Sequence, residues 1–451
     1  MKIPDEAVPL PPFTKLEYGV PFEDLNERFV VSDDTARSLA RTYGTPLYVL
    51  SEAHFRHRIR RYQAAFKACW PKSTLTYASK ANSTLAVLAI AYDEGCLIDV
   101  ASEGELRAAL AAGVPAHFCH LHGNFKKADE LRFAIDAGVD QIMVDSFEEL
   151  ACLRQLNRPL PSLMLRLAPG VRPQTNSKIS TGQDDTKFGF NIADGSAARA
   201  VEECAAHGMP LRGFHAHVGS QLLDPDAQRQ AGSLLARFAI DMLHRGIEVQ
   251  EINVGGGLGV RYLANDAPME VEAYCQLVVG AVQDALAGTP LMNSTLTQEP
   301  GRTLIAECGV TLYTVGPVKT VPTDTGTRTY ATVDGGLSDN PRPALYGGVY
   351  DVRKIGSAAG AKDFTIAGRH CETDRLFSDV SLPSDLKSGD LLQVLCTGAY
   401  NSSMASNYNR FLRPATVLLR EDGTDVLVQS RETYDQMFAR EINPFKPHAS
   451  I

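Results

Sequence analysis

A lysine at the end of an apolar segment is the first residue whose type and position suggest chemistry. Segment 73–78 is a candidate strand, and it leads into Tyr77-Ala78-Ser79-Lys80-Ala81-Asn82. An amine held at the carboxyl end of a buried strand can form a Schiff base with a carbonyl compound. A lone lysine is more often a solvated surface residue, so Lys80 by itself leaves both interpretations open.

Two further segments end in residues suited to a planar, charged ligand. His215 and His217 stand two apart on one strand face, which suits a metal pair or one stacking ring beside one structural histidine. No acidic or cysteine partner stands at metal-ligand spacing in the sequence, so we expect no metal. The run Gly255-Gly256-Gly257-Leu258-Gly259 either lets backbone N–H groups approach a phosphate or forms a tight turn. It lacks the order of a dinucleotide-binding fingerprint, which argues against a nicotinamide oxidoreductase.

A carboxylate and two arginines complete the candidate set. Glu299-Pro300-Gly301-Arg302 follows the apolar segment 295–298, and the proline restricts the turn that aims Glu299 and Arg302. Arg166 lies near the end of segment 163–167, where burial of a guanidinium needs an anion or a carboxylate partner.

These residues share one position in a repeating pattern of elements. Between about residues 46 and 300, apolar segments alternate with helical segments that end at a glycine. Several apolar segments are unbroken, as in parallel strands buried on both faces. The candidate strands are 46–50, 73–78, 97–100, 118–121, 141–144, 163–167, 211–217, 249–254 and 295–298. They predict an α/β fold with a TIM-like (β/α)8 barrel, and an open doubly wound sheet is the structural alternative.

The rest of the chain has a different pattern. From about residue 308 to 430, short segments rich in Val, Thr and Tyr alternate with Gly, Pro and Asp turns. This predicts a second, mostly antiparallel domain, a β-barrel or β-sandwich. The first 45 residues contain one helical segment, 32–43, and no core of their own. We therefore expect a barrel domain at 46–307, and a β domain formed by 308–451 and completed by 1–45.

Composition excludes several classes of protein. The 451 residues carry 44 Lys and Arg against 53 Asp and Glu, a net charge of −9 without a basic run, which argues against binding of nucleic acids or anionic membranes. The longest strongly apolar segment, 85–92, is far shorter than the ~20 residues that span a bilayer, and no secretory leader is visible. Nine cysteines without a CxxC pair indicate reduced thiols, so we expect a cytoplasmic protein.

A barrel gathers the carboxyl ends of its strands at one mouth, so the candidate residues should meet there. Together they suit pyridoxal phosphate. A lysine holds the aldehyde, glycine turns and a serine hold the phosphate, and an imidazole covers the ring. A carboxylate keeps the pyridine nitrogen protonated, so that the ring accepts electrons.

Longer motifs identify a family. Over about residues 30–440 the sequence resembles the fold-type III pyridoxal phosphate decarboxylases, which share the barrel of alanine racemase, and most closely the diaminopimelate decarboxylase family. The motifs are Tyr-Ala-Ser-Lys-Ala-Asn (77–82), Ile-Ser-Thr-Gly-x-x-Asp-x-Lys-Phe-Gly (179–189), His-x-His-Val-Gly-Ser-Gln (215–221), Gly-Gly-Gly-Leu-Gly (255–259), Glu-Pro-Gly-Arg (299–302), Arg-Pro-Ala-Leu-Tyr (342–346), Cys-Glu (371–372) and Gly-Ala-Tyr-x-x-Ser-Met-x-Ser-Asn-Tyr-Asn (398–409).

The resemblance implies a role for each matching position. Lys80 is similar to the Schiff-base lysine, and His217 to the ring stacked on the cofactor. Cys371 resembles the acid that protonates the product carbanion, and Glu299 the partner of the pyridine nitrogen. The cofactor-binding residues implied are Lys80, Asp99, Arg166, His217, Ser220, Gly256, Gly257, Glu299, Pro300, Gly301, Arg302 and Tyr400, with Asp99 as the candidate partner of Arg166.

The implied substrate is meso-2,6-diaminopimelate, which has an amino-acid group at each end and loses CO2 to give L-lysine. Its distal group needs cations for a carboxylate and an anion for an ammonium. The residues implied to bind substrate are Arg302, Arg342, Tyr346, Glu372 and Tyr400. In the family, the residues that match Cys371 and Glu372 reach across a dimer interface, so a homodimer with shared active sites is implied.

Two departures from the family pattern lie near the distal pocket. The usual Cys-Glu-Ser-Gly-Asp run is Cys371-Glu372-Thr373-Asp374-Arg375 here, without the glycine and with an added cation, and 346–350 is rich in glycine. They leave open a decarboxylase of the same family that acts on a D-amino acid, a polyamine precursor, or a siderophore or carrier-linked intermediate. A non-catalytic regulatory relative is a remote alternative.

Overall fold

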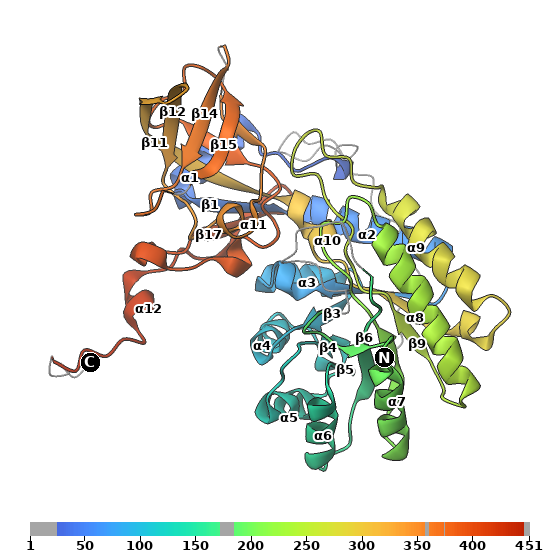
Figure 1. Ribbon diagram of the computed structural model, residues 1–451. Helices are drawn as coiled ribbons and strands as arrows, with labels where there is room; N and C mark the ends of the chain where they lie inside the picture. Colours follow the sequence, from blue (N-terminus) through green and yellow to red (C-terminus); the bar gives the residue numbers. More distant parts are fainter. Residues whose placement is uncertain (1–24, 172–184, 357–359, 374, 446–451) are drawn as a thin grey trace.

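The computed structural model describes residues 25–171, 185–356, 360–373 and 375–445. Figure 1 shows a barrel ringed by helices, a β-sheet region beside it, and a C-terminal arm that projects away from both. No helix within the described ranges is both long and apolar enough to cross a bilayer.

Parallel strands form a closed barrel, as predicted. Around the barrel the order is β5 (Gln141–Val144), β4 (Cys119–Leu121), β3 (Leu97–Val100), β2 (Ser73–Ala78), β10 (Thr295–Gln298), β9 (Glu251–Asn253), β8 (Leu211–His215) and β6 (Ser162–Ala168). Pairing of β5 with β6 closes the ring, which rules out the open sheet. The short β7 (Phe190–Asn191) pairs with β6.

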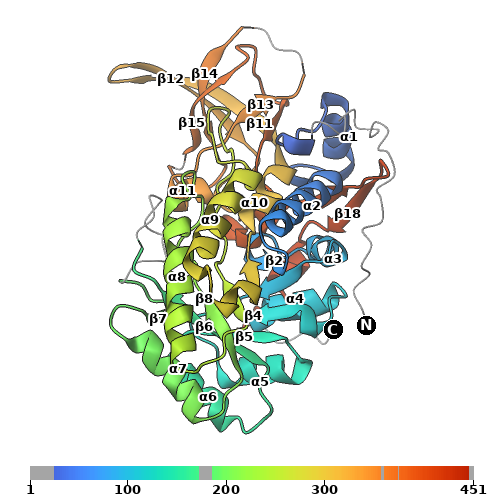
Figure 2. The ribbon, with the colours of Figure 1, turned by 90° about the vertical axis from the view of Figure 1, so that its right-hand side faces the viewer.

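Helices surround these strands on the outside (Figure 2). They are α2 (Glu52–Cys69), α3 (Leu85–Asp93), α4 (Glu103–Ala111), α5 (Ala128–Ala137), α6 (Phe147–Gln155), α7 (Ser196–Ala206), α8 (Asp226–His244) and α9 (Val271–Leu286). Because α2 precedes the first barrel strand, it takes the place that follows the last one, packed against α9 and α3. Its apolar stripe, which includes Phe55, Ile59, Tyr62 and Phe66, is buried in that position.

The first predicted strand belongs to the other sheet. β1 (Leu47–Ser51) pairs antiparallel with β11 (Gly309–Thr323) and parallel with β17 (Ala415–Leu419). The prediction that segment 46–50 opens the barrel is therefore wrong. All five residues of β1 are buried, so the segment has the same unbroken apolar pattern as a barrel strand.

A mixed, mostly antiparallel sheet forms the second region. Its main order is β15 (Arg375–Leu382), β14 (Lys362–Ala367), β12 (Gly326–Val333), β11, β1, β17 and β18 (Asp425–Gln429), and β16 (Leu391–Val394) pairs with β11 and β13 (Val352–Lys354). The region also carries α11 (Arg342–Tyr346) and α12 (Tyr434–Phe438), and α10 (Arg302–Ile305) precedes β11.

The N-terminal helix packs on this second sheet. Ser32 caps α1 (Asp33–Tyr43) by accepting a hydrogen bond from the N–H of Thr35. Apolar residues from the start of the described chain share one core with strands of the sheet. That core includes Phe29, Val31, Ala36, Leu39, Leu47, Val310, Leu312 and Val417. These contacts support the expectation that the N-terminal segment completes the β region.

The close approach of β8 and β9 yields a test of barrel packing. A Cβ at Gly213 would lie 1.8 Å from the Glu251 carbonyl oxygen. We expect Gly213→Ala to lower the free energy of unfolding by about 1–3 kcal/mol, visible as a lower Tm. Gly280→Ala in α9 is the control, because a Cβ there meets no atom within 4 Å and alanine favours helix. Equal Tm values for the two variants would contradict the packing described.

Candidate active site

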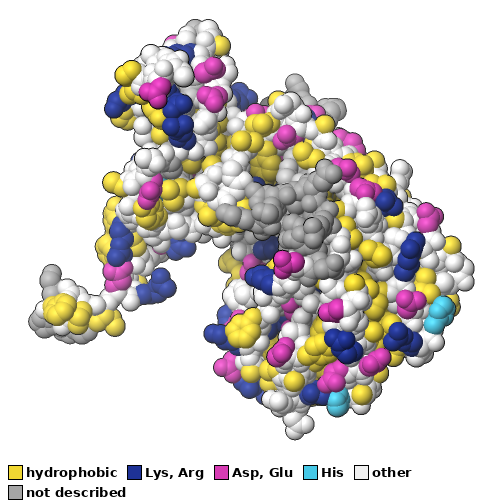
Figure 3. All heavy atoms as spheres, in the orientation of Figure 1, with side chains coloured by type: hydrophobic (Ala, Val, Ile, Leu, Met, Phe, Trp, Pro, Cys, Tyr) yellow, Lys and Arg dark blue, Asp and Glu magenta, His cyan; other side chains and the backbone are white. Residues whose placement is uncertain are grey.

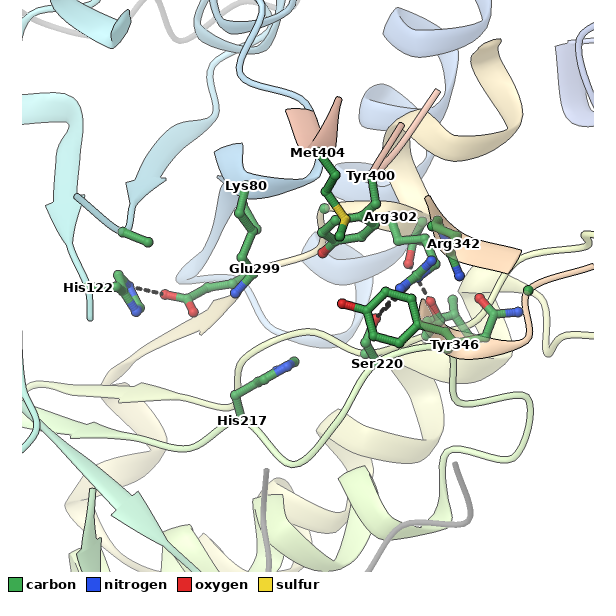
Figure 4. Close-up of a pocket in the computed structure, with 18 of the residues that line it drawn as sticks. Lys80, His122, His217, Ser220, Glu299, Arg302, Arg342, Tyr346, Tyr400 and Met404 are labelled. Carbon is green, nitrogen blue, oxygen red and sulfur yellow. Dashed lines mark hydrogen bonds and ion pairs between the residues drawn. The ribbon is translucent and has the colours of Figure 1, made fainter. Parts of the chain in front are cut away.

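A cavity of about 640 Å³ lies at the carboxyl ends of the barrel strands (Figure 4). It collects most of the predicted residues: Lys80, Arg166, His217, Ser220, Gly257, Glu299, Gly301, Arg302, Arg342, Tyr346 and Tyr400. Asp99, Gly256 and Pro300 contact or directly adjoin these residues. The barrel supplies one side of the cavity, whereas α11 and the segment around Tyr400 supply the other.

Lys80 presents an amine at the barrel mouth. It stands in a 3-10 turn, Ser79–Ala81, directly after β2. Its Nζ lies 3.9 Å from Asp99 Oδ2 on β3, and 48% of its side chain is exposed to the cavity. Burial lowers the pKa of Lys80, but Asp99 and Tyr400 outweigh burial and leave that pKa above its usual value.

Glu299 is a buried carboxylate surrounded by nitrogen donors. Asn253 Nδ2 lies 2.6 Å and His122 Nε2 3.2 Å from Oε1, and His215 Nε2 lies 3.0 Å from Oε2. Burial raises the pKa of the Glu299 carboxyl, but His122 and His215 outweigh it and hold the pKa well below its usual range. Glu299 is therefore an anion at neutral pH.

Two residues of this cluster escaped the sequence analysis. His122 follows β4 directly, and Asn253 is the last residue of β9. Their place at the ends of barrel strands was a usable signal, because a barrel carries its chemistry there. In space, however, His215 does have an acidic partner: ligand atoms of His122, His215 and Glu299 lie within 4.8 Å of one another. Glu299 is 84 residues from His215, so spacing along the chain did not show the contact.

His217 forms a flat, uncharged wall of the cavity. Its Nδ1 accepts the N–H of Gly256 at 3.4 Å, so the proton of the neutral ring is on Nε2. Burial, together with the positive charges of Lys80 and Arg166, lowers the pKa of His217 well below its usual value. A neutral ring in this position suits stacking on a planar cofactor.

The backbone around the glycine-rich turn packs too closely to admit a side chain at Gly256 or Gly257. A Cβ would lie 2.3 Å from the Glu299 carbonyl oxygen at Gly256, and 2.7 Å from the Gly219 carbonyl oxygen at Gly257. Ser220 Oγ accepts hydrogen bonds from Nε and Nη2 of Arg302, each at 3.2 Å. The backbone N–H groups of a glycine turn, a hydroxyl and a guanidinium suit a phosphate. With Lys80, His217 and Glu299 beside them, these donors fit pyridoxal phosphate.

Two arginines meet at one tyrosine hydroxyl. Nη1 of Arg302 and Nη1 of Arg342 donate to the oxygen of Tyr262, at 2.6 and 2.5 Å. The Arg302 guanidinium also lies 4.6 Å from the centre of the Tyr400 ring. Tyr262, which sequence reasoning missed, therefore links the cation beside Ser220 to a second cation farther along the cavity.

The carboxylate nearest to Arg166 differs from the predicted one. Its Nε lies 3.9 Å from Asp145 Oδ1, and its guanidinium lies 4.2 Å from the centre of the Phe188 ring. The predicted partner, Asp99, instead faces Lys80 and His122. The prediction was wrong because β6 pairs with β5, which leads into Asp145, whereas Asp99 is on β3.

Cys371 and Glu372 do not line the cavity. Cys371 is exposed, and its N–H donates to Asn409 Oδ1 at 3.0 Å. Glu372 accepts a hydrogen bond from the Tyr408 hydroxyl. Within one chain, the structure therefore does not bring this pair to Lys80. Most of the predicted motif 179–189 lies outside the described residues.

Comparisons with known proteins place the chain in a family. Residues 53–306 match the family model described as "Pyridoxal-dependent decarboxylase, pyridoxal binding domain". The chain is 41% identical to the diaminopimelate decarboxylase of Bacillus subtilis (strain 168), over 90% of this chain and 93% of that one. It is 35% identical to the diaminopimelate decarboxylase of Staphylococcus aureus (strain COL), over 91% of this chain and 97% of that one.

A solved structure agrees with these matches. The crystal structure of diaminopimelate decarboxylase from M. jannaschii in co-complex with L-lysine superposes with a TM-score of 0.84 and 31% identity, and covers 96% of this chain and 98% of that one. Both the barrel and the β region are thus shared. The chain belongs to the pyridoxal-dependent decarboxylases and, among them, to the diaminopimelate decarboxylase family.

Proposed function

We propose that this chain uses pyridoxal phosphate to decarboxylate meso-2,6-diaminopimelate to L-lysine and CO2. The observation that carries the proposal is the two-ended cavity of Figure 4, with Lys80 and Glu299 at one end and Arg342 and Tyr346 at the other. The first end suits the cofactor, and the second suits the distal amino-acid group of a long substrate. The lysine complex of the M. jannaschii relative supports the same class of ligand.

The residues of the site have different roles toward the cofactor. When bound, pyridoxal phosphate accepts the electron pair that remains as CO2 departs. Lys80 binds its aldehyde carbon, His217 covers one face of the ring, and the Glu299 anion keeps a proton on the pyridine nitrogen. The residues that bind and enclose the cofactor are Asp99, Arg166, Ser220, Gly256, Gly257, Pro300, Gly301, Arg302 and Tyr400. Asp99 acts through Lys80, because it lies against the amine.

The distal end of the cavity selects the substrate. Arg342, with Arg302 beside it, binds the distal carboxylate, and Tyr346 and Tyr400 close the space around it. Of the two departures from the family pattern, the glycines matter more here, since Gly347 and Gly348 line the cavity. Arg375, the added cation, opens β15 and is not among the residues that line the cavity.

A homodimer would supply the cysteine that the cavity of one chain lacks. No cysteine is found among the described residues that line it. In the proposed dimer, Cys371 and Glu372 of each subunit complete the site of the other. The Cys371 thiol then gives its proton to the carbon that has lost CO2 and recovers a proton from solvent, and Glu372 binds the distal ammonium.

An exposed apolar arm supports this dimer. Tyr434, Phe438, Ile442 and Phe445 are 57%, 46%, 74% and 93% exposed, and Figure 3 shows hydrophobic side chains gathered on the arm that carries α12. An ion pair between Arg410 and Glu441 links this arm to the segment that contacts Cys371 and Glu372. The arm and the Cys371 loop thus form one continuous surface.

All nine cysteines are unpaired, which supports a reducing compartment, and we propose the cytoplasm.

The substrate is tested by CO2 release from protein loaded with pyridoxal phosphate. We expect turnover of meso-diaminopimelate with lysine as product, and none of D-lysine, L-lysine, ornithine or arginine. Turnover of another amino acid in place of diaminopimelate would move the chain to the alternative specificity within the family. Cofactor binding without any turnover would favour a non-catalytic relative.

The role of Lys80, which follows β2, is tested against Lys72, which directly precedes the same strand. Lys80→Ala should lose turnover by about a thousandfold or more, together with the visible absorbance of the bound cofactor, because the binding amine is gone. Lys72→Ala removes an exposed amine that donates to the Asn293 carbonyl oxygen, and it should keep both. Full activity in Lys80→Ala would refute the assignment.

Shared sites predict rescue between two inactive variants. Lys80→Ala lacks the amine and Cys371→Ala lacks the acid, so each homodimer is expected to be nearly inactive. Mixed and reassembled subunits should regain about a quarter of wild-type activity, because half of the dimers then contain one complete site. Size-exclusion chromatography with light scattering checks that dimers form. Dimers without any recovery would show that Cys371 serves its own chain, and full activity of the Cys371→Ala homodimer would show that it has no role.

A further inference from the structure

The carboxylate of Glu299 is held more tightly than its charge alone requires. Its two oxygens face Asn253, His122 and His215, on three different strands or strand ends. All four side chains are buried, with exposures between 0% and 7%. A buried anion needs partners, but one cation would satisfy that need. The hydrogen bonds from Asn253 and His215 and the contact with His122 restrict the orientation of the carboxylate as well as its charge.

Asn253 is oriented by the glycine-rich turn. Its Oδ1 accepts the N–H of Gly255 at 2.9 Å, so its Nδ2 is the atom that faces Glu299. The backbone N–H of Glu299 in turn donates to the Gly255 carbonyl oxygen at 2.9 Å. Because an N–H group of Asn253 already occupies Oε1, the cluster presents donors to the carboxylate rather than an open set of metal ligands.

His122 lies between the two carboxylates of the site. Its Nε2 is 3.2 Å from Glu299 Oε1 and 3.8 Å from Asp99 Oδ1, and Asp99 faces the amine of Lys80. The ring of His122 also meets that of His215 edge to face, with centroids 5.2 Å apart. Figure 4 shows His122 beside the Glu299 carboxylate, and His122 also lines the cavity.

We propose that His122, Asn253 and His215 are positioning residues that keep Glu299 anionic and fixed in one orientation toward the pyridine nitrogen of the cofactor. The inference rests on the proposed role of Glu299. It assigns a function to three residues that bind neither substrate nor phosphate. Loss of their N–H groups leaves a buried carboxylate without donors, which favours its protonated form and removes the proton from the pyridine nitrogen.

The test measures the protonation state of the pyridine nitrogen directly in the holoenzyme. Pyridoxal phosphate labelled with 15N in the ring is bound to each variant, and the 15N chemical shift reports whether that nitrogen is protonated. We expect His122→Leu and His215→Leu to shift the signal toward the unprotonated value and to lower kcat about tenfold or more, with KM little changed. His122→Gln, which keeps an N–H donor, should recover part of both.

Two control variants distinguish a failure of the role proposed for Glu299 from a failure of the positioning role. His120→Leu alters a buried histidine of β4 whose Nε2 faces Asp140, and it should leave the 15N signal unchanged. Glu299→Gln should give the largest shift of all. If Glu299→Gln leaves the nitrogen protonated, the proposed role of Glu299 fails. If Glu299→Gln shifts the signal but the His122 and His215 variants do not, only the positioning role is overturned.

Discussion

Closure of the parallel barrel is the constraint on which the site depends. Pairing of β5 with β6 completes the ring, so the strand ends that carry Lys80, His217 and Glu299 must lie at one rim. These residues are far apart along the chain, and no local segment could bring them together. A rigid rim also explains how donors from several strands meet one carboxylate at hydrogen-bond distance.

The same rim makes it possible to bury so many charges. Each one takes its partner from another strand end: Lys80 for Asp99, Asp145 for Arg166, and a set of N–H groups for Glu299. Isolated burial of any of these groups would cost several kcal/mol. Because the partners are fixed by strand order, the site reaches its protonation states before ligands arrive: an ionised carboxylate, a neutral His217 and a charged amine. Such preorganisation is typical of catalytic sites.

Much of this arrangement could be predicted from the sequence, and the exceptions have physical reasons. The barrel strands were visible as apolar segments separated by helices, and the resemblance to a family supplied roles for isolated residues. Which sheet β1 joins could not be inferred, because a strand buried on both faces has the same pattern in either sheet. The partner of Arg166 depends on strand order, and the donors to Glu299 depend on contacts between distant strands. Cys371 lies outside the cavity that contains Lys80 in the same chain, and a motif match does not show where its loop lies.

The pairing of β1 with β11 has a consequence for how the two regions of the molecule are connected. β1 and β11 are antiparallel neighbours, with Leu50 opposite Gly309, yet the whole barrel lies between them in the chain. The barrel is thus an insertion into a hairpin of the β region, with both of its ends at one point. During synthesis from the N-terminus, β1 is made long before its neighbours β11 and β17 exist. The barrel can close first, and its closure brings the two ends of the hairpin together, which reduces the entropy lost when a loop of residues 51–308 is joined. A barrel that closes first therefore sets β1 and β11 side by side, where the second sheet forms.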